Sequence, residues 1–231
     1  MLKAVLFDID DTLFPTTEFA LRARRDAVAA MVATGLDFPE EVVLAELLEV
    51  ISEFSSNYDH HFNKLLNRLD PNGKRYRDPA LVVAAGVAAY HDTKFKNLLP
   101  FDDVIPLMEY IRSRGWICGI VTQGWATKQA EKLVRLGLLP HLDWGAIFIS
   151  DTIGINKPNP KLYQLAARSL DLVPSQVMYV GDNPGHDVAP AMALGMPAVF
   201  AKRASRWKLD EVDATHTISD FNELRAILTA Y

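Results

Sequence analysis

From residue 100 onwards, short apolar runs alternate with stretches whose apolar residues recur at helical spacing. One such stretch begins at Asp103, which can cap a helix, and ends at Gly115. The apolar runs cover residues 3–7, 116–121, 146–149, 177–180 and 198–200. Alternating strands and helices are typical of a parallel sheet with crossover helices. The sequence therefore predicts an α/β fold with a central parallel sheet of five strands.

Further helices are expected between and after these strands. Asn159 followed by Pro160 is a suitable N-cap and first helical position. Asp220 and Glu223 have the spacing of a capping box. The helices predicted in this half of the chain cover residues 126–136, 160–170 and 187–194 and the segment after Asp220.

The segment between the first and second predicted strands has a different character. Residues 15–99 contain helical patterns and no convincing strand alternation. Pro15 and Pro100 suit the linkers at its two ends. We therefore predict a discontinuous core of residues 1–14 and 100–231, with a helical domain of residues 15–99 inserted after the first strand. Its expected helices cover residues 18–34, 39–54, 61–69 and 79–95.

Three carboxylates follow the first predicted strand at Asp8, Asp10 and Asp11. Two like charges about 4 Å apart repel by roughly 4 kcal/mol at an effective dielectric of 20. Clustered acids at a strand end therefore usually hold a metal ion or share a proton. If the strand geometry continues, Asp8 and Asp10 share a face, and Asp11 points away to solvent or caps the turn.

Polar residues also follow the later strands. Thr122-Gln123-Gly124 follows the second strand, Lys157 lies beyond the third, and Asp182 with Asp187 follows the fourth. Ligands of open parallel sheets bind beyond the carboxyl ends of the strands. We therefore expect these side chains to meet Asp8 and Asp10 at one edge of the sheet.

The composition limits the classes of molecule that this chain is expected to bind. A net charge of −5 and a pI near 5.7 argue against nucleic acid, and the basic residues Lys202, Arg203, Arg206 and Lys208 form too short a group to change this. Cys118 is interpreted as a small buried hydrophobe, which favours a reducing compartment. Asp8 interrupts the N-terminal apolar run, and no apolar segment approaches 18 residues. We expect no membrane partner and a cytoplasmic location.

These motifs, in this order, resemble those of the haloacid dehalogenase (HAD) superfamily of phosphatases. The resemblance covers the whole chain. It implies a Rossmann-like core, and residues 15–99 resemble the C1-type cap of that family. Residues 23–27 and 90–95 more narrowly resemble archaeal glyceraldehyde 3-phosphate phosphatases of the superfamily.

The resemblance implies phosphoryl transfer through an aspartyl phosphate. Asp8 resembles the family nucleophile, and Asp10 would protonate the leaving group and then activate water. Lys157 would neutralise the phosphoryl group, while Thr122 and the backbone N–H groups of Gln123 and Gly124 would bind its oxygens. An oxygen-only site suits Mg²⁺. Its expected ligands are Asp8, Asp182, the Asp10 backbone carbonyl and Asp187, which would alternatively orient Lys157.

The expected activity is Mg²⁺-dependent hydrolysis of a small phosphorylated metabolite, with a sugar or triose phosphate as first choice. A phosphomutase and a non-catalytic regulatory module with the same fold are the alternatives, and Asp10 makes a dehalogenase the least favoured. Gln123 departs from the Asn or Asp that is frequent at its position. The predicted domain of residues 15–99 offers His60, His61, His91 and Lys94 as substrate contacts, and a monomer or a homodimer is expected.

Overall fold

The computed structural model describes residues 1–55, 58–96, 98–207 and 212–231. The chain divides into two compact units. The core unit comprises Met1–Thr17 and Leu98–Tyr231, and the helical unit comprises Glu18–Asn97.

The core unit is built around one parallel sheet of six strands in the order β3-β2-β1-β4-β5-β6. The α/β class is confirmed. The prediction of five strands was wrong by one, because His216–Ile218 forms a short edge strand in which only Ile218 is buried. A strand with one buried side chain leaves no apolar run in the sequence. The strands are β1 (Ala4–Phe7), β2 (Ile117–Thr122), β3 (Ile147–Ile149), β4 (Val177–Gly181), β5 (Ala198–Ala201) and β6 (His216–Ile218).

The strand order reverses beside β1. From β1, strands β2 and β3 lie on one side, and β4, β5 and β6 lie on the other. Loops that leave neighbouring strands at such a switch point diverge and open a crevice at the carboxyl edge of the sheet. Asp8 follows β1 and Asp182 follows β4, so two of the predicted site residues lie at this point.

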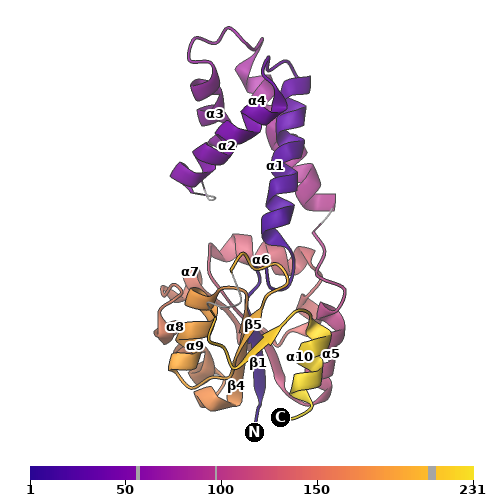
Figure 1. The fold of residues 1–231 in the computed structure, drawn as a ribbon, viewed down its shortest axis with the longest axis vertical. Coiled ribbons are helices and arrows are strands. Elements are labelled where there is room, and N and C mark those ends of the chain that lie inside the picture. The colour runs from indigo at the N-terminus through magenta and orange to yellow at the C-terminus, as the bar shows by residue number, and fades with distance from the viewer. Residues whose placement is uncertain (56–57, 97, 208–211) are drawn as a thin grey trace. The chain divides into compact units, whose positions relative to one another are not determined.

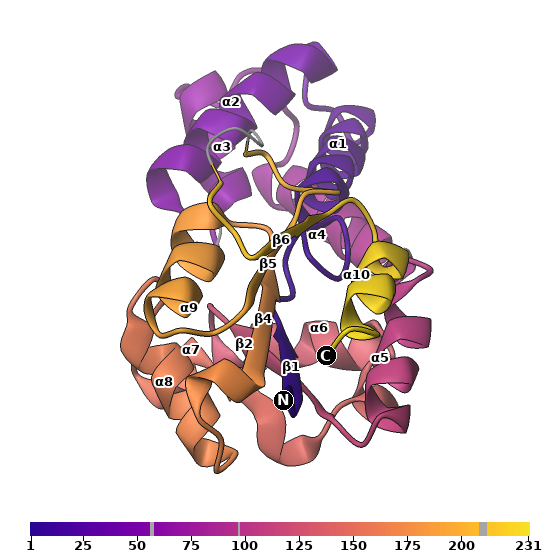
Figure 2. The same ribbon diagram turned by 60° about the horizontal axis from the view of Figure 1, so that its bottom comes forward.

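Helices cover both faces of the sheet (Figures 1 and 2). Helices α8 and α9 lie on one face, and α5 and α10 lie on the other. Asn159 caps α8 through a bond from the Lys161 N–H to its side chain, as predicted. The core helices are α5 (Val104–Ser113), α6 (Ala126–Arg135), α7 (Ser150–Ile153), α8 (Pro160–Ser169), α9 (Ala189–Ala193) and α10 (Phe221–Leu228).

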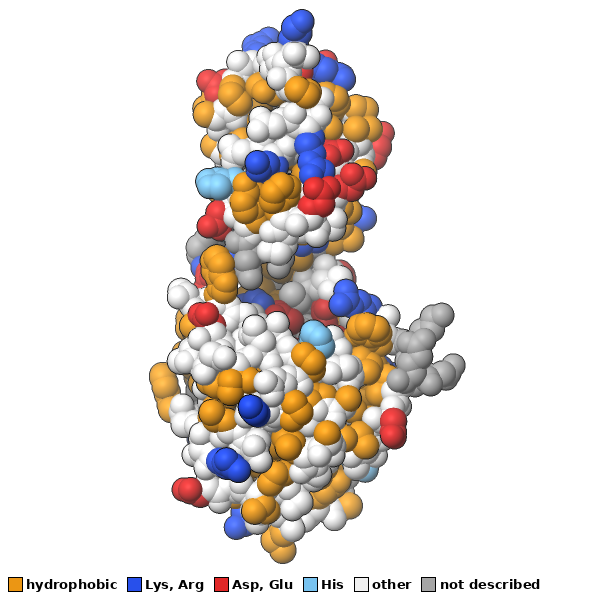
Figure 3. Space-filling view, turned by 90° about the vertical axis from the view of Figure 1, so that its left-hand side faces the viewer, with side chains coloured by type: hydrophobic (Ala, Val, Ile, Leu, Met, Phe, Trp, Pro, Cys, Tyr) orange, Lys and Arg blue, Asp and Glu red, His pale blue; other side chains and the backbone are white. Residues whose placement is uncertain are grey.

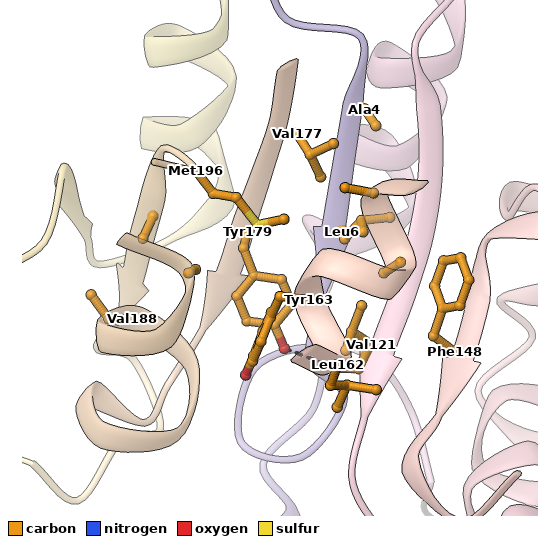
Figure 4. Packing of buried hydrophobic residues seen from close by; sticks show 14 of the residues in the cluster. Ala4, Leu6, Val121, Phe148, Leu162, Tyr163, Val177, Tyr179, Val188 and Met196 are labelled. Atoms are coloured by element: carbon orange, nitrogen blue, oxygen red, sulfur yellow. Dashed lines mark hydrogen bonds between the residues drawn. The ribbon is translucent and has the colours of Figure 1, made fainter. Parts of the chain in front are cut away.

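Strand β1 is buried on both faces because its side chains alternate between two hydrophobic layers. Leu6 packs into the cluster beneath α8 and α9, with Tyr163 and Tyr179 (Figure 4). Phe7 points to the other layer, where its ring meets Phe221 of α10 edge to face at 5.9 Å. Burial on both faces explains why the strand is a continuous apolar run. It also holds the backbone that leads into Asp8.

Two helix starts differ from the sequence predictions. Asp103 does not cap α5 with its side chain, because that carboxylate pairs with Arg203 and accepts the Phe221 N–H. The helix expected from Asp187 instead begins with a π-helical turn over Pro184–Val188, followed by α9. Asp187 is therefore buried within a turn.

The helical unit has a core of its own. Val28, Met31, Leu47 and Leu66 are among its buried residues. Gly86 lets α4 approach α1 closely, because a Cβ at this position would lie 2.8 Å from the Met31 side chain. Hydrophobic side chains also reach its surface beside charged ones (Figure 3). The helices are α1 (Thr16–Ala33), α2 (Glu40–Phe54), α3 (His61–Leu69) and α4 (Pro79–Lys96).

Among the described residues, no helix combines the length and apolar character needed to cross a membrane. Cys118 is fully buried in β2, and burial raises the pKa of its thiol to about 12. The interpretation of Cys118 as a buried hydrophobe is confirmed.

Candidate active site

Asp8 is the first residue beyond β1, and its backbone remains tied to the sheet. Its N–H donates to the carbonyl of Val180 in β4 at 2.9 Å. The side chain is 10% exposed and accepts a hydrogen bond from Lys157 Nζ at 2.6 Å. A carboxylate held by its own strand and by a neighbouring lysine has little freedom to rotate. The orientation of the Asp8 carboxylate is therefore fixed by these contacts.

Lys157 lies at the centre of a buried polar cluster. Its ammonium group donates to Asp8 Oδ1 at 2.6 Å, Asp187 Oδ1 at 2.7 Å and the Tyr179 hydroxyl at 2.8 Å. An ammonium group has three protons, so these bonds use its full donor capacity. Burial alone would lower the pKa of Lys157, but the charges of Asp187 and Asp8 outweigh it and raise this pKa. The lysine is therefore held charged.

Asp187 and Tyr179, which bind the Lys157 ammonium group together with Asp8, are themselves held by further hydrogen bonds. The second carboxylate oxygen of Asp187 accepts the Asn183 N–H at 3.0 Å. The Tyr179 hydroxyl donates to the carbonyl of Val121 in β2 at 2.8 Å, a contact visible in Figure 4. Gly181 makes room for this arrangement, because a Cβ there would lie 2.4 Å from the Asp187 side chain. Strands β2 and β4 together thus determine where the lysine amine lies.

Negative charge exceeds positive charge in this cluster. Burial raises the pKa of Asp8 to about 7, and repulsion from Asp187 and Asp10 adds to this despite Lys157. Burial likewise raises the pKa of Asp182 to about 8, with repulsion from Asp8 and Asp187 adding to it. A single lysine therefore does not neutralise the three carboxylates that meet here.

The same three residues can hold a divalent cation. Asp8, Asp182 and Asp187 each offer one carboxylate oxygen, and these oxygens lie within 4.8 Å of one another. An all-oxygen donor set suits a hard cation such as Mg²⁺. Burial and mutual repulsion raise the pKa values of Asp8 and Asp182, and a cation bound between them would offset both effects. The residues present therefore fit a metal site.

Asp10 is held by a different lysine. Lys132 Nζ donates to both carboxylate oxygens of Asp10, at 2.6 and 2.7 Å, and the Thr16 hydroxyl donates to one of them at 2.7 Å. Burial alone would raise the pKa of Asp10, but the charge and hydrogen bonds of Lys132 outweigh it and lower this pKa. The structure therefore separates the two acids predicted to share one face, so that each has its own ammonium group.

The second predicted motif is connected to Asp10 through Gln129 of α6. The Gln129 side chain accepts from the Thr122 hydroxyl at 3.4 Å and donates to the Gln123 carbonyl at 3.0 Å and to Asp10 Oδ2 at 3.4 Å. Gly124 permits this approach, because a Cβ there would lie 2.6 Å from Gln129 Nε2. The Gly124 N–H donates to Ser150 Oγ at 3.1 Å.

The remaining residues of the first motif have structural contacts. Asp11 turns away and accepts hydrogen bonds from the backbone N–H and the hydroxyl of Thr17, at 2.8 and 2.5 Å, so it caps the start of α1. This confirms one of the two roles expected for it. Thr12 Oγ1 is buried and, among the described residues, has no hydrogen-bond partner. It borders a cavity of about 10 Å³, room for roughly one water molecule.

Sequence reasoning did not identify three of the residues that shape this site. Gln129 and Lys132 lie three positions apart on α6, hence on one helix face, directly after the second motif. That spacing was a usable signal. Tyr179 lies within an apolar strand, where a tyrosine is more often a packing residue, so only the tertiary contacts reveal its role.

Other polar candidates have local contacts within their own units. Arg203 pairs with Asp103 and covers the Phe101 ring at 4.4 Å, whereas Lys208 lies outside the described residues. In the helical unit, a His61 ring nitrogen lies 2.7 Å from the Ser55 carbonyl, and His60 packs against Tyr58. The proposed substrate contacts of His60, His61, His91 and Lys94 stay predictions.

Known proteins resemble this chain over most of its length. The model of the haloacid dehalogenase-like hydrolases matches residues 2–195. A glyceraldehyde 3-phosphate phosphatase from Methanopyrus kandleri is 46% identical over 207 residues, which cover 88% of this chain and 85% of that protein. A protein of the same name from Methanothermobacter thermautotrophicus is 35% identical over 237 residues, covering 99% of this chain and 100% of that protein.

A solved structure agrees with these sequence relatives. The crystal structure of a HAD phosphatase from Thermococcus onnurineus superposes with a TM-score of 0.64 and 27% identity. The match covers 98% of each chain.

Proposed function

The chain belongs to the haloacid dehalogenase-like hydrolases and is a phosphatase, and we propose that it hydrolyses a triose phosphate such as glyceraldehyde 3-phosphate through a phosphoryl group carried by Asp8. The observation that carries the mechanism is the buried contact of Lys157 with both Asp8 and Asp187. The names of the relatives support the choice of substrate.

In the first step, an Asp8 carboxylate oxygen attacks phosphorus and the bond from phosphorus to the leaving oxygen breaks. Asp10 donates a proton to that oxygen, so the product leaves as an alcohol. In the second step, the Asp10 carboxylate takes a proton from water, and the water oxygen attacks phosphorus. The bond from Asp8 to phosphorus then breaks, which restores Asp8 and releases phosphate.

The ion pair with Lys132 favours the carboxylate form of Asp10, the form that the second step requires. The first step requires the protonated form. A bound phosphate brings negative charge close to Asp10, which raises the pKa of this carboxyl group and favours uptake of a proton. Transfer of that proton to the leaving oxygen then leaves Asp10 as the carboxylate that the second step requires.

Lys157 serves the phosphoryl group as well as Asp8. Its buried ammonium lowers the repulsion between the attacking carboxylate and the anionic phosphate. We assign the phosphate oxygens to Thr122 and to the backbone N–H groups of Gln123 and Gly124. The Gly124 N–H must then exchange its bond to Ser150 for one to phosphate.

We assign a Mg²⁺ ion to the carboxylates of Asp8 and Asp182, with the Asp10 backbone carbonyl as a third protein ligand. When bound, this ion supplies positive charge that offsets the charge of the phosphate. One carboxylate oxygen of Asp187 accepts a hydrogen bond from Lys157, and the other accepts one from the Asn183 N–H. Its principal role is therefore to orient Lys157.

From the raised pKa values of Asp8 and Asp182, we predict how the stability of the metal-free protein depends on pH. The pKa of Asp8 rises from the ordinary 3.8 to about 7, and that of Asp182 rises from 3.8 to about 8. At pH values between the ordinary and the raised pKa, the folded protein therefore binds more protons than the unfolded chain. Its free energy of unfolding therefore falls as the pH rises through this window. Mg²⁺ binds the ionised carboxylates. We expect it to raise the melting temperature clearly at pH 8 and little at pH 5, as measured by thermal unfolding.

The variant Asp182→Asn tests the same assignment, and Asp151→Asn is its matched control. Asp182→Asn removes one carboxylate, so it should melt higher than wild type at pH 8 without Mg²⁺ and gain less from adding the ion. Asp151→Asn, an exposed acid of α7, should behave like wild type. An equal effect of Mg²⁺ at both pH values would contradict the assignment.

We propose that the helical unit acts as the cap that selects the leaving group, because it is inserted between the nucleophile strand and the rest of the core. We also propose a cytoplasmic enzyme, which the buried thiol of Cys118 supports. Its proposed partner is a small phosphorylated metabolite. We propose a monomer or a homodimer, and the exposed Leu81 and Val87 of α4 are compatible with a homodimer.

A panel of phosphate esters tests the substrate. With Mg²⁺, the purified protein should release phosphate from glyceraldehyde 3-phosphate with a higher kcat/KM than from sugar phosphates, phosphoglycolate or nucleotides. Analysis of the organic product separates a phosphatase from a mutase, since a mutase yields an isomeric phosphate and little free phosphate. No turnover across the panel would favour the regulatory module instead.

A further inference from the structure

We propose that Lys132 is a positioning residue that orients the Asp10 carboxyl group for proton transfer to the leaving group. The inference rests on the proposed function, because it gives Asp10 the role of acid. It concerns a residue outside the predicted motifs, on helix α6.

The contact between Lys132 and Asp10 restricts the orientation of the carboxyl group as well as its distance from the ammonium group. Both carboxylate oxygens receive a bond from the same ammonium group, at 2.6 and 2.7 Å. Thr16 and Gln129 then add one bond to each oxygen, at 2.7 and 3.4 Å respectively. Rotation of the carboxyl group about its bond to Cβ would disturb several of these contacts at once.

The Asp10 side chain needs such support because it extends from the end of the strand and is partly exposed. Asp10 lies in the turn after β1, next to Asp11, which has a positive φ of 54°. Its side chain is 31% exposed, whereas that of Lys132 is 18% exposed. The better-packed lysine therefore anchors the more exposed acid. Proton transfer requires a heavy-atom distance of about 2.6–3.2 Å, so a freely rotating carboxyl group would often be misplaced.

The two lysines of the site have separate tasks on this interpretation. Lys157 holds the nucleophile Asp8 and is fully engaged there. Lys132 holds Asp10 and is supplied by α6, which also carries Gln129. A direct contact of Lys132 with the phosphoryl group is the competing interpretation. The two differ in which substrates should depend on the lysine.

A leaving group that is a weak base departs without a proton, whereas an alkoxide does not. The experiment therefore compares kcat/KM, which reports on the step that expels the leaving group, for p-nitrophenyl phosphate and for glycerol 3-phosphate. Lys132→Met should lose about 10²-fold with the alkyl ester, the lower end of what general acid catalysis contributes. With the aryl ester it should lose at most a few fold. Asp10→Asn should show the same pattern more strongly.

Two further variants complete the test. Lys132→Arg keeps a donor with positive charge and should recover most of the activity on glycerol 3-phosphate. Lys161→Met removes the same charge from an exposed side chain of α8 and should leave both esters unaffected. Thermal unfolding checks each variant, and Lys132→Gln replaces Lys132→Met if the latter does not fold.

The outcomes are distinct. Equal losses of Lys132→Met on the two esters would overturn the proposal in favour of phosphate binding or a general structural role, and so would the absence of any loss. A wild-type protein inactive on both esters would instead refute the proposed function, and the inference with it. A loss confined to the alkyl ester, restored by arginine, supports it.

Discussion

Replacing Asp8 with asparagine is expected to lower the rate of p-nitrophenyl phosphate hydrolysis by at least about 10⁴-fold, as removal of a catalytic nucleophile does in other hydrolases. The amide cannot attack phosphorus to form an acyl phosphate. The fold should survive, because the amide has the shape of the acid and Lys157 keeps Asp187 and Tyr179 as partners. The assay is phosphate release with saturating Mg²⁺, with thermal unfolding alongside.

The chain supplies a matched control three residues later. Asp11→Asn makes the same chemical change, but the Asp11 carboxylate caps α1 through Thr17. Asparagine is an equally good capping residue and tolerates the positive φ of this position. Activity close to wild type is expected. If Asp8→Asn retained substantial activity, the nucleophile would have to be another residue and the mechanism would be wrong.

Replacing Lys157 with methionine is expected to damage both stability and activity. The side chain is 4% exposed and its ammonium group contacts two carboxylates. Removing one partner of such a buried ion pair costs about 3–5 kcal/mol, because the remaining charges are left uncompensated. Activity should fall by about 10²–10³-fold with the loss of charge stabilisation. Denaturant unfolding and kcat on p-nitrophenyl phosphate measure the two effects.

A double variant separates the two losses. Lys157→Met with Asp187→Asn removes one of the stranded negative charges, so part of the lost stability should return while activity stays low. The instability of the single variant should also grow as the pH rises, because Asp8 ionises without its counter-charge. A single variant as stable as wild type at pH 8 would show that the buried cluster does not depend on this lysine.

Much of the core was predictable because its signals are local. Five of the six strands are apolar runs, since a central parallel strand buries both faces. The missed strand His216–Ile218 is an edge strand with one buried residue, which produces no such run. The cap of Asn159 on α8 was found because a cap and its helix are neighbours in sequence. Asp103 was misassigned because its partners, Arg203 and Phe221, are about a hundred residues away.

The candidate site likewise has features that the sequence predicts and features that only the fold decides. The order of the motifs and the parallel topology place Asp8, Lys157 and Asp182 at one edge of the sheet, because strand ends are positions along the chain. Which lysine meets which acid is a property of the assembled fold. Lys132 reaches Asp10 across 122 residues of sequence, and Tyr179 joins Lys157 only because β4 lies beside β1.

The sequence by itself thus determined the α/β class and the family, since each rests on hydrophobic periodicity or on short motifs. The tertiary structure decided how the charges are distributed. It gave Asp8 and Asp10 a lysine each and left Asp182 with a raised pKa. The physical reason is that electrostatic interactions depend on distances of a few ångströms between atoms, and only the packing of α6 and of the loop before α8 against the sheet sets those distances.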